Sequence, residues 1–427
     1  MKTTKFFMMA ALTLTFAACS NDDNEIIPQS SQTEGIPFSA TISIDNGTTT
    51  RAITENGTTL ETSWAENEKV ALIHNGVSDE MSVSSVSGGV ATITGTITGS
   101  PSGGDDVTII YPSDAADGAT GNVKSDWLAA QDGTLKGTGG TSIEEKYDVR
   151  KGTGTLNATG TSFSGTVSLT NQNAIFKLTL KDIDGSNNVS ASSVKIYNQE
   201  NTLLTTVTPA SGYEKVMYVA LPTTATTLKF AVTDGTTNYF NMASGLTLGT
   251  NFYQATIKLA TVGDVILSTG KCAKAGTSGA VAMIAYLGDG SGCMNGLAIE
   301  LNSSPESKKW ADGTTYLAKE YAEGLTAVPS GTWRLPTKAD WQNMFVGCAV
   351  SGDASASDSM MNPIAGFKAK IAATGTTWQS GDYWSSTEYG DSRAEYVFVR
   401  LYNDYAVAYF NLDYKFSGHY VLGCLAF

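Results

Sequence analysis

The sequence predicts an all-β N-terminal half, made of two β-sandwich domains, followed by an α+β C-terminal domain. Short runs of alternating apolar and polar residues recur between residues 38 and 259, and Asn-Gly pairs separate several of them. After residue 262 the pattern changes to near-continuous apolar runs and two short helical segments. Charged residues form only 16% of the chain, and Gly, Thr, Ser and Asn are abundant, which favours strands and turns over long helices.

The first residues have the three parts of an export signal. Lys2 and Lys5 supply the positive start, and residues 6–16 form an apolar run that is too short to span a membrane as a helix. Phe16-Ala17-Ala18-Cys19 resembles the lipobox of bacterial lipoproteins. This resemblance implies that residues 1–18 are a signal peptide and that Cys19 becomes the lipidated N-terminus. An ordinary secretory signal that happens to carry a cysteine is the alternative.

Residues 19–36 are expected to form an acidic tether, because the polar stretch after Cys19 cannot build a core. The stretch also resembles the short acidic signal that sends some lipoproteins of Gram-negative anaerobes to the outer face. We therefore expect a surface-exposed protein of the outer membrane, held there through the lipid of the acylated cysteine. The formal net charge of −14 argues against a nucleic-acid partner.

Two sandwiches are predicted, over residues 37–150 and 151–262. Strand candidates of the first are Phe38–Ile44, Val70–Ile73, Val90–Ile93 and Val107–Tyr111. Strand candidates of the second are Phe163–Leu169, Ala174–Leu180, Ser193–Tyr197, Val216–Leu221, Thr227–Val232 and Phe252–Leu259. The boundary is set where the pattern restarts after a polar Gly/Thr stretch near 133–142.

Several local phrases resemble the fimbrillin family, the subunits of type V pili. They are Thr50-Arg51-Ala52, Thr62-Ser63-Trp64 running to Lys69-Val70-Ala71, Ile109-Ile110-Tyr111-Pro112, Gln131-Asp132-Gly133-Thr134, and the stretch 249–259. The resemblance implies two transthyretin-like β-sandwich domains exported as a lipoprotein. It also implies proteolytic processing between Arg51 and Ala52, which would remove the first strand with its anchor. Other pilus subunits would then bind by donor-strand exchange. An ordinary exposed arginine is the alternative reading of Arg51.

The C-terminal domain is predicted over residues 263–427. Apolar strands are expected at 280–286 and 297–301, and short helices at 316–323 and 338–345, the second capped by Thr337 and Asp340. Two tryptophan motifs stand out in this domain, Trp333-Arg334-Leu335-Pro336-Thr337 before the second helix and Tyr383-Trp384-Ser385-Ser386-Thr387-Glu388 after it. An apolar strand is expected at the end of the domain. Cys272, Cys293, Cys348 and Cys424 could form disulfides or remain buried thiols.

These motifs, in this order, resemble the C-type-lectin-like and formylglycine-generating-enzyme-like fold. The resemblance is greater to the variable proteins of diversity-generating retroelements. It implies a hypervariable ligand-binding surface between the Tyr-Trp-Ser-Ser-Thr-Glu phrase and the last strand. The ligand-binding residues expected there are Tyr389, Asp391, Ser392, Arg393, Tyr396, Phe398, Arg400, Tyr402, Asn403, Tyr405, Tyr409, Asn411, Asp413, Tyr414, Phe416 and His419.

The composition of this segment supports a binding surface on its own terms. Tyr mixed with Asn, Ser, Gly and a few Arg is typical of paratopes, because Tyr offers a large amphipathic contact area at low rotamer cost. Alternation places Val397 and Val399 on a core side and Phe398 and Arg400 on the other. An aromatic β-core without a ligand is the alternative. Most residues of the segment can arise from Asn codons by changes at adenines, as retroelement diversification would require.

No catalytic or cofactor motif is recognisable. The chain has no Walker-type phosphate loop, no HExxH and no GxSxG, and its two histidines have no nucleophile motif beside them. We therefore expect no enzymatic activity, no cofactor and no bound metal. The sequence predicts a cell-surface adhesin, as the tip subunit of a type V pilus, with a host, microbial or glycan ligand. A permanently lipid-anchored surface protein that binds a ligand without entering a pilus is the alternative.

Overall fold

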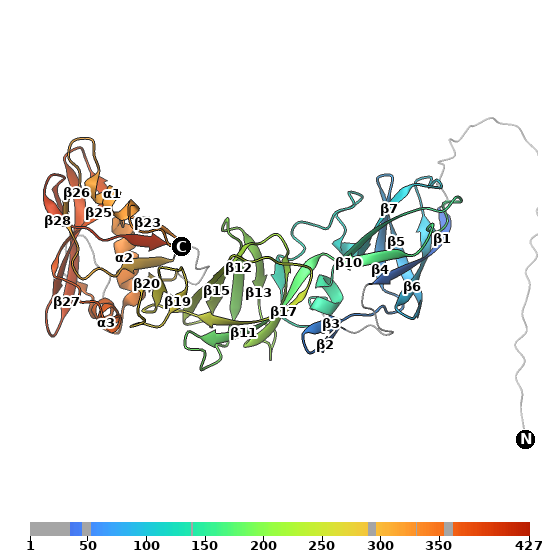
Figure 1. Ribbon diagram of the computed structural model, residues 1–427, viewed down its shortest axis with the longest axis horizontal. Coiled ribbons are helices and arrows are strands. Elements are labelled where there is room, and N and C mark those ends of the chain that lie inside the picture. Colours follow the sequence, from blue (N-terminus) through green and yellow to red (C-terminus); the bar gives the residue numbers. More distant parts are fainter. Residues whose placement is uncertain (1–34, 45–52, 138–139, 289–295, 330, 354–361) are drawn as a thin grey trace, which may run out of the picture. The chain divides into compact units, whose positions relative to one another are not determined.

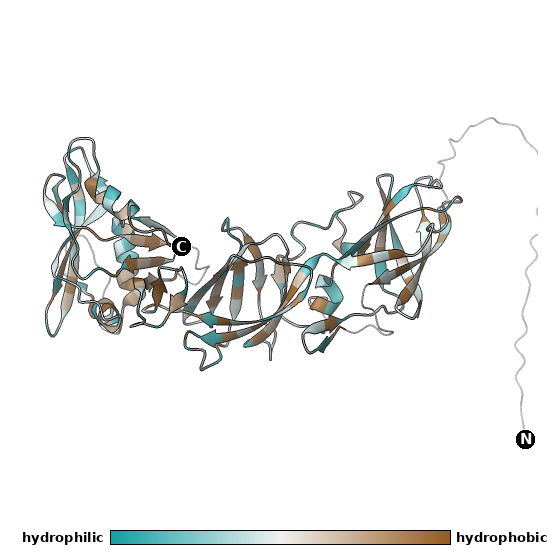
Figure 2. Cartoon of the chain, in the orientation of Figure 1, coloured by the Kyte–Doolittle hydropathy of each residue, from teal (hydrophilic) through white to brown (hydrophobic). Residues whose placement is uncertain are grey.

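Strands make up most of the regular structure of this chain, as the sequence predicts (Figure 1). The computed structural model describes residues 35–44, 53–137, 140–288, 296–329, 331–353 and 362–427. Three α-helices lie in this described part, all of them after residue 316. Figure 2 shows short hydrophobic and hydrophilic bands along the strands, the pattern expected of sheets with one face in a core.

The first structural unit is a closed barrel with strand order β1-β10-β9-β7-β4-β5-β6. Its strands are β1 (Ile36–Ile44), β4 (Lys69–His74), β5 (Val77–Ser87), β6 (Val90–Ile97), β7 (Asp106–Tyr111), β9 (Arg150–Thr155) and β10 (Val167–Asn171). The apolar residues of β1 alternate into the barrel, where Phe38, Ala40, Ile42 and Ile44 join the core around Leu72. A small hairpin of β2 (Thr54–Asn56) and β3 (Thr59–Glu61) follows β1 in the chain.

The barrel extends past the predicted domain boundary at residue 150. β9 pairs with β7, and β10 pairs in parallel with β1 through Ile42 and Val167, so the first unit ends at Asn171. Conversely, β8 (Ala130–Gln131) belongs to the second unit, and the Gln131 side chain bonds both main-chain groups of Ala220. Phe163 lies outside β10, so the strand expected at 163–169 begins only at Val167.

The second unit contains two sheets that enclose one core. One sheet has the order β14-β11-β17 and the other β16-β15-β12-β13-β8. Their strands are β11 (Asn173–Asp182), β12 (Ser193–Tyr197), β13 (Leu203–Val207), β14 (Val216–Pro222), β15 (Thr227–Thr233), β16 (Asn238–Ser244) and β17 (Phe252–Leu259). Leu178 and Val219 from the first sheet meet Ile196 and Phe230 from the second. A 3₁₀ turn (Ser113–Ala115) and a π-helical turn (Ile143–Tyr147) lie between β7 and β9 in the chain.

The C-terminal part has two six-stranded sheets and the three α-helices. The first sheet has the order β19-β18-β20-β21-β29-β23 and the second β22-β28-β25-β26-β27-β24. The first sheet comprises β18 (Val265–Leu267), β19 (Cys272–Ala273), β20 (Ala280–Tyr286), β21 (Leu297–Glu300), β23 (Thr332–Arg334) and β29 (Cys424–Ala426). The second comprises β22 (Ser307–Lys309), β24 (Asn362–Pro363), β25 (Gly381–Tyr389), β26 (Arg393–Leu401), β27 (Ala406–Tyr414) and β28 (Gly418–Tyr420).

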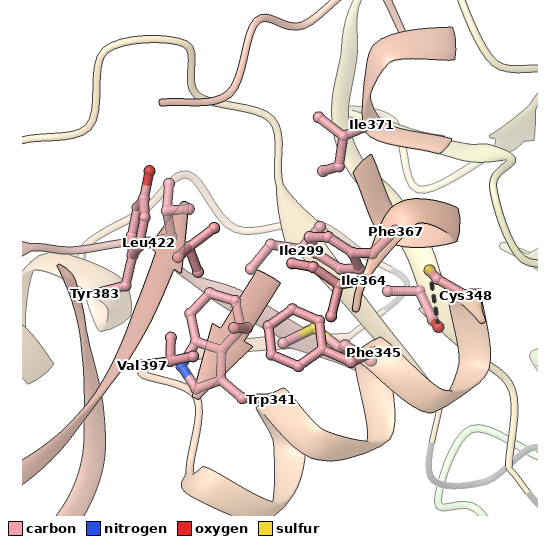
Figure 3. Close-up of a cluster of buried hydrophobic side chains, with 14 of the residues drawn as sticks. Ile299, Trp341, Phe345, Cys348, Ile364, Phe367, Ile371, Tyr383, Val397 and Leu422 are labelled. Atoms are coloured by element: carbon pink, nitrogen blue, oxygen red, sulfur yellow. Dashed lines mark hydrogen bonds between the residues drawn. The ribbon is translucent and has the colours of Figure 1, made fainter. Parts of the chain in front are cut away.

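A tight aromatic core lies between these sheets and the helices α2 (Lys338–Cys348) and α3 (Ala365–Ala373). Figure 3 shows Trp341 and Phe345 of α2 facing Phe367 of α3 and Val397 of β26. Trp341 is completely buried, and its ring centroid lies 5.9 Å from that of Phe345. This core fixes the orientation of the second sheet, which carries most of the predicted binding residues.

Both predicted helices of this domain are confirmed, and a third was missed. Helix α1 (Leu317–Glu323) begins one residue after Tyr316, and α2 begins after Thr337, as expected. Thr337 and Asp340 form a reciprocal capping box. Cys348 and Cys424 are buried free thiols and Cys272 is a partly buried one, while Cys293 lies outside the described residues. Burial raises the pKa of each of these three thiols to about 12, so they stay protonated and unreactive.

Candidate ligand-binding surface

The predicted binding segment folds as a long hairpin in the middle of the second C-terminal sheet. β26 and β27 pair over nine residues, from Arg393 opposite Tyr414 to Leu401 opposite Ala406. β25 lies on the other side of β26, with Trp384 opposite Tyr396. The hairpin therefore sits on a sheet whose inner face is anchored in the aromatic core.

The alternation expected along β26 is present. Val397 and Val399 are fully buried against the aromatic core. Tyr396, Phe398 and Arg400 point to the other face of the sheet and are half-buried. On that face Phe398 contacts Tyr409 of β27, with ring centroids 4.5 Å apart. The middle of the hairpin is therefore a packed aromatic surface, not a freely accessible one.

The strongly exposed aromatic side chains gather at the two ends of the hairpin. One group, which we call the tip pair, consists of Tyr402 and Tyr405, 46% and 52% exposed and stacked 4.3 Å apart. The other, the base cluster, consists of Tyr389, Tyr414 and Phe416, which are 61%, 43% and 66% exposed. The nine residues of β26 separate the two groups by roughly 30 Å of strand. The exposed aromatic residues of the predicted set therefore form two separated groups, and Tyr396 and Phe398 between them are half-buried.

Polar members of the predicted set accompany both ends. Asn403 is exposed in the turn beside the tip pair, and Asp391 and Ser392 are exposed in the turn before β26. The Arg393 guanidinium lies over the Tyr414 ring at 4.9 Å, and the Tyr414 and Phe416 rings stack at 5.1 Å. Asn411 is exposed on β27 opposite Tyr396. Each exposed aromatic group is thus bordered by adaptable hydrogen-bonding groups.

His419 lies between these ends, beneath the surface. Its ring packs against Trp384 at 4.3 Å and Tyr396 at 4.6 Å, and its Nε2 atom lies 3.0 Å from Asp413 Oδ2. Burial lowers the pKa of His419 below its ordinary value, although Asp382 and Asp413 act in the opposite direction. At neutral pH the imidazole is therefore an uncharged polar group packed against these two rings.

An ion pair that sequence analysis did not anticipate lies beside His419. Arg400 donates to Asp382 of β25 at 3.1 Å and also lies over the Phe398 ring at 3.4 Å. Both side chains line a surface cleft of about 340 Å³, together with Ser307, Ser380, Gly381, Gly418, His419 and Tyr420. Asp382 could have been found from the sequence, because it stands two residues before Trp384 and alternation puts both on one face.

The two tryptophan motifs of the sequence contact each other through hydrogen bonds. Ser386 donates its main-chain N–H to the Pro336 carbonyl at 2.7 Å, and Lys338 N–H donates to Thr387 Oγ1 at 3.0 Å. Arg334 forms an ion pair with Asp340 of the capping box. A second cleft, of about 770 Å³, opens beside these contacts and is lined by residues that include Trp310, Tyr316, Lys319 and Glu388.

The remaining predicted sites fall elsewhere. Cys19, Arg51 and Ala52 lie outside the described residues. Within the described ranges, no three His, Cys, Asp or Glu side chains stand close enough together to hold a metal ion. The same ranges contain no helix with the length and apolar character needed to cross a membrane.

Comparison with known proteins yields only distant likenesses. No protein-family model and no curated protein matches the chain. A solved fimbrial protein from Bacteroides ovatus aligns at 12% identity over 92% of this chain and 100% of its own length, with a TM-score of 0.28. A fimbrial assembly protein from Parabacteroides distasonis aligns at 14% identity over 52% of this chain and 90% of its own, also at 0.28. Similarity at this level does not assign a family or a function, so a function can be inferred only from the residues of this chain.

Proposed function

We propose that this protein is a cell-surface adhesin whose C-terminal domain binds a ligand through the β26–β27 hairpin. The observation that carries the proposal is the pair of exposed aromatic groups, Tyr402 with Tyr405 and Tyr389 with Tyr414 and Phe416. Large aromatic side chains exposed together are costly to keep in water, and they are common anchors of binding surfaces. Tyr402 and Tyr405 lie at the turn of this hairpin, whereas Tyr414 ends β27, Phe416 stacks on it and Tyr389 ends the neighbouring β25. A buried core holds these strands in place, which limits the entropy lost on binding.

The first barrel supports assembly into a pilus by donor-strand exchange. β1 pairs with β6 on one side and with β10 on the other, and four of its side chains fill the barrel core. Removal of this strand after cleavage at Arg51 would leave two unpaired strand edges and an open apolar groove. Such a groove accepts an incoming strand through main-chain hydrogen bonds and side-chain pockets.

The position of β29 supports a place at the pilus tip. This strand pairs with β21 on one side and with β23 on the other, and Cys424 and Leu425 are fully buried. Because both edges of β29 are already paired within its own domain, β29 is not available for donation to another subunit. Immunogold label against the C-terminal domain is therefore expected at fibre ends, and label along the shafts would contradict a tip position.

Adhesion of cells that display the chain tests the proposed function. Bacteria displaying the full chain should adhere to epithelial monolayers or to lawns of other bacteria more than cells that lack it. The double variant Tyr389→Ser/Phe416→Ser should lose most of this adhesion. The matched control is Leu203→Ser in β13, an exposed apolar residue far from the hairpin in sequence. Equal adhesion by the wild type and the double variant would contradict the role of the base cluster.

The fate of Arg51 separates the pilus subunit from a permanently anchored lipoprotein. N-terminal sequencing of the surface-exposed protein should find a chain that begins at Ala52. A chain that still begins at the acylated Cys19 would instead support the anchored ligand-binding protein.

A further inference from the structure

The cleft beside Arg400 has a lining that restricts what it can bind. Its floor consists of Asp382, Arg400, His419 and Tyr420, all of them half-buried, and its rim includes the exposed residues Ser307 and Ser380. A side chain at Gly381 would not fit, because an added Cβ would lie 2.4 Å from the Tyr420 ring. The volume of about 340 Å³ is that of a site for one small ring, not for an extended ligand.

The charges of the cleft are balanced before any ligand arrives. Arg400 and Asp382 neutralise one another at 3.1 Å, and His419 is uncharged at neutral pH because of its burial. A second carboxylate, Asp413, lies behind His419. An anionic ligand would meet the Asp382 carboxylate, and a cationic ligand would meet the Arg400 guanidinium. An apolar ligand would deprive all of these polar groups of water without giving hydrogen bonds in return.

A neutral ligand with many hydroxyl groups fits this arrangement. Each hydroxyl both donates and accepts, so neighbouring hydroxyls can donate to the Asp382 carboxylate and accept from the Arg400 guanidinium. The hydroxyls of Ser307 and Tyr420 can donate or accept, whereas the Ser380 hydroxyl already bonds the main chain of Leu401. We propose that this cleft binds a single uncharged pyranose ring, so that the ligand of the adhesin includes a neutral glycan. This inference rests on the proposed adhesive function and specifies its ligand class.

A peptide fits the cleft less well. Recognition of an extended peptide by strand addition needs an unpaired strand edge. Here β25 pairs with β26 and β28, β26 pairs with β25 and β27, and β28 pairs with β22 and β25. The floor of the cleft can therefore contact a ligand through side chains only, and these side chains come from the three strands β25, β26 and β28.

Saturation-transfer NMR and chemical-shift titration of the full chain test the proposal. The probes are the methyl glycosides of glucose, galactose, mannose, fucose and N-acetylglucosamine. N-acetylneuraminic acid and the tetrapeptide Ala-Gly-Ala-Gly serve as an anionic and a peptide probe. At least one neutral glycoside should bind, and excess EDTA should leave its affinity unchanged. Asp382→Asn should weaken it by about tenfold or more, because the strongest acceptor is lost. Asp126→Asn, the same change at an exposed residue far from the hairpin and the cleft in sequence, should leave affinity within about twofold.

Three results would overturn the proposal. They are no binding of any neutral glycoside, binding only of the acidic sugar or the peptide, and equal losses in Asp382→Asn and Asp126→Asn. The adhesion assay distinguishes this failure from failure of the proposed function. If cells adhere although no glycoside binds, the proposed adhesive function stands and the sugar site does not. If a glycoside binds but the cells do not adhere, the sugar site stands and the proposed adhesive function is contradicted.

Discussion

Lys368 of α3 donates a hydrogen bond to the main-chain carbonyl of Asn403 at 3.1 Å and another to the carbonyl of Tyr402. A helix of the core is thereby tied to the turn that carries the tip pair. The turn is closed by a hydrogen bond from Tyr402 N–H to Tyr405 O at 2.8 Å. The stacked tyrosines are therefore presented by a turn that is fixed before any ligand binds, which reduces the ordering cost of binding.

Replacement of Lys368 by Met should loosen this turn without unfolding the domain. The ammonium group bridges two carbonyls at an exposed site, so its loss removes the tie but leaves the aromatic core unchanged. Hydrogen exchange of the amides in residues 402–405 should become faster, while exchange in α2 should not change. Lys370→Met on the same helix is the control, because Lys370 contacts the Val262 carbonyl instead. Equal acceleration in both variants would contradict the assigned role of Lys368.

Exposed and buried aromatics of the C-terminal domain should differ sharply in their contribution to stability. Phe416→Ala should change the free energy of unfolding by no more than about 0.5 kcal/mol, since two thirds of the side chain already faces water. Trp341→Ala should cost about 3–5 kcal/mol, because it empties the centre of the core shown in Figure 3. Urea denaturation followed by tryptophan fluorescence measures both. A large loss for Phe416→Ala would mean that the base cluster is structural and not kept for binding.

Local patterns in the sequence were sufficient to locate most individual elements. Period-two alternation identified β1, β11 and the inward-facing Val397 and Val399. Thr337 and Asp340 identified the start of α2 through capping chemistry alone. These features depend only on residues close together in the chain, and one sequence contains that information.

Pairings between distant residues could not be predicted in the same way. β10 completes the first barrel because Val167 pairs with Ile42, and nothing near residue 150 or 167 encodes that partner. For the same reason, the sequence did not predict that the strongly exposed aromatic residues gather at the two ends of the hairpin. Phe398 is half-buried, with Tyr409 and Arg400 packed against its ring, and the Tyr409 contact follows from strand register.

Acidification should destabilise the protein through His419. Burial lowers the pKa of the folded imidazole below 6.5, and the nearby Asp382 and Asp413 do not fully offset it. The unfolded chain therefore binds the proton more readily than the folded chain. The contribution of His419 to the free energy of unfolding is complete above pH 6.5 and is lost as pH falls through the folded pKa.

Two measurements check this prediction. Proton NMR titration of His419 should give a midpoint below 6.5, with the resonance assigned by its loss in His419→Gln. The stability of His419→Gln, measured by urea denaturation, should fall less than that of the wild type between pH 7 and pH 5. Besides Asp382 and Asp413, Tyr396 is a titratable side chain packed on this ring, and it stays protonated throughout this range because burial raises its pKa. A midpoint at or above 6.5 would contradict the buried position of His419.

The capping box of α2 should stabilise the junction of the two tryptophan motifs. Thr337 Oγ1 accepts the Asp340 N–H at 3.1 Å, and the Asp340 carboxylate accepts the Thr337 N–H at 2.7 Å and pairs with Arg334. Thr337→Ala should cost about 1 kcal/mol of unfolding free energy, and Asp340→Asn should cost more because the Arg334 guanidinium loses its partner. Thr337→Ser retains the cap and should stay near the wild type. Denaturation midpoints measure all three, and a Ser variant as unstable as the Ala variant would show that packing of the methyl group, not the cap, holds this helix start.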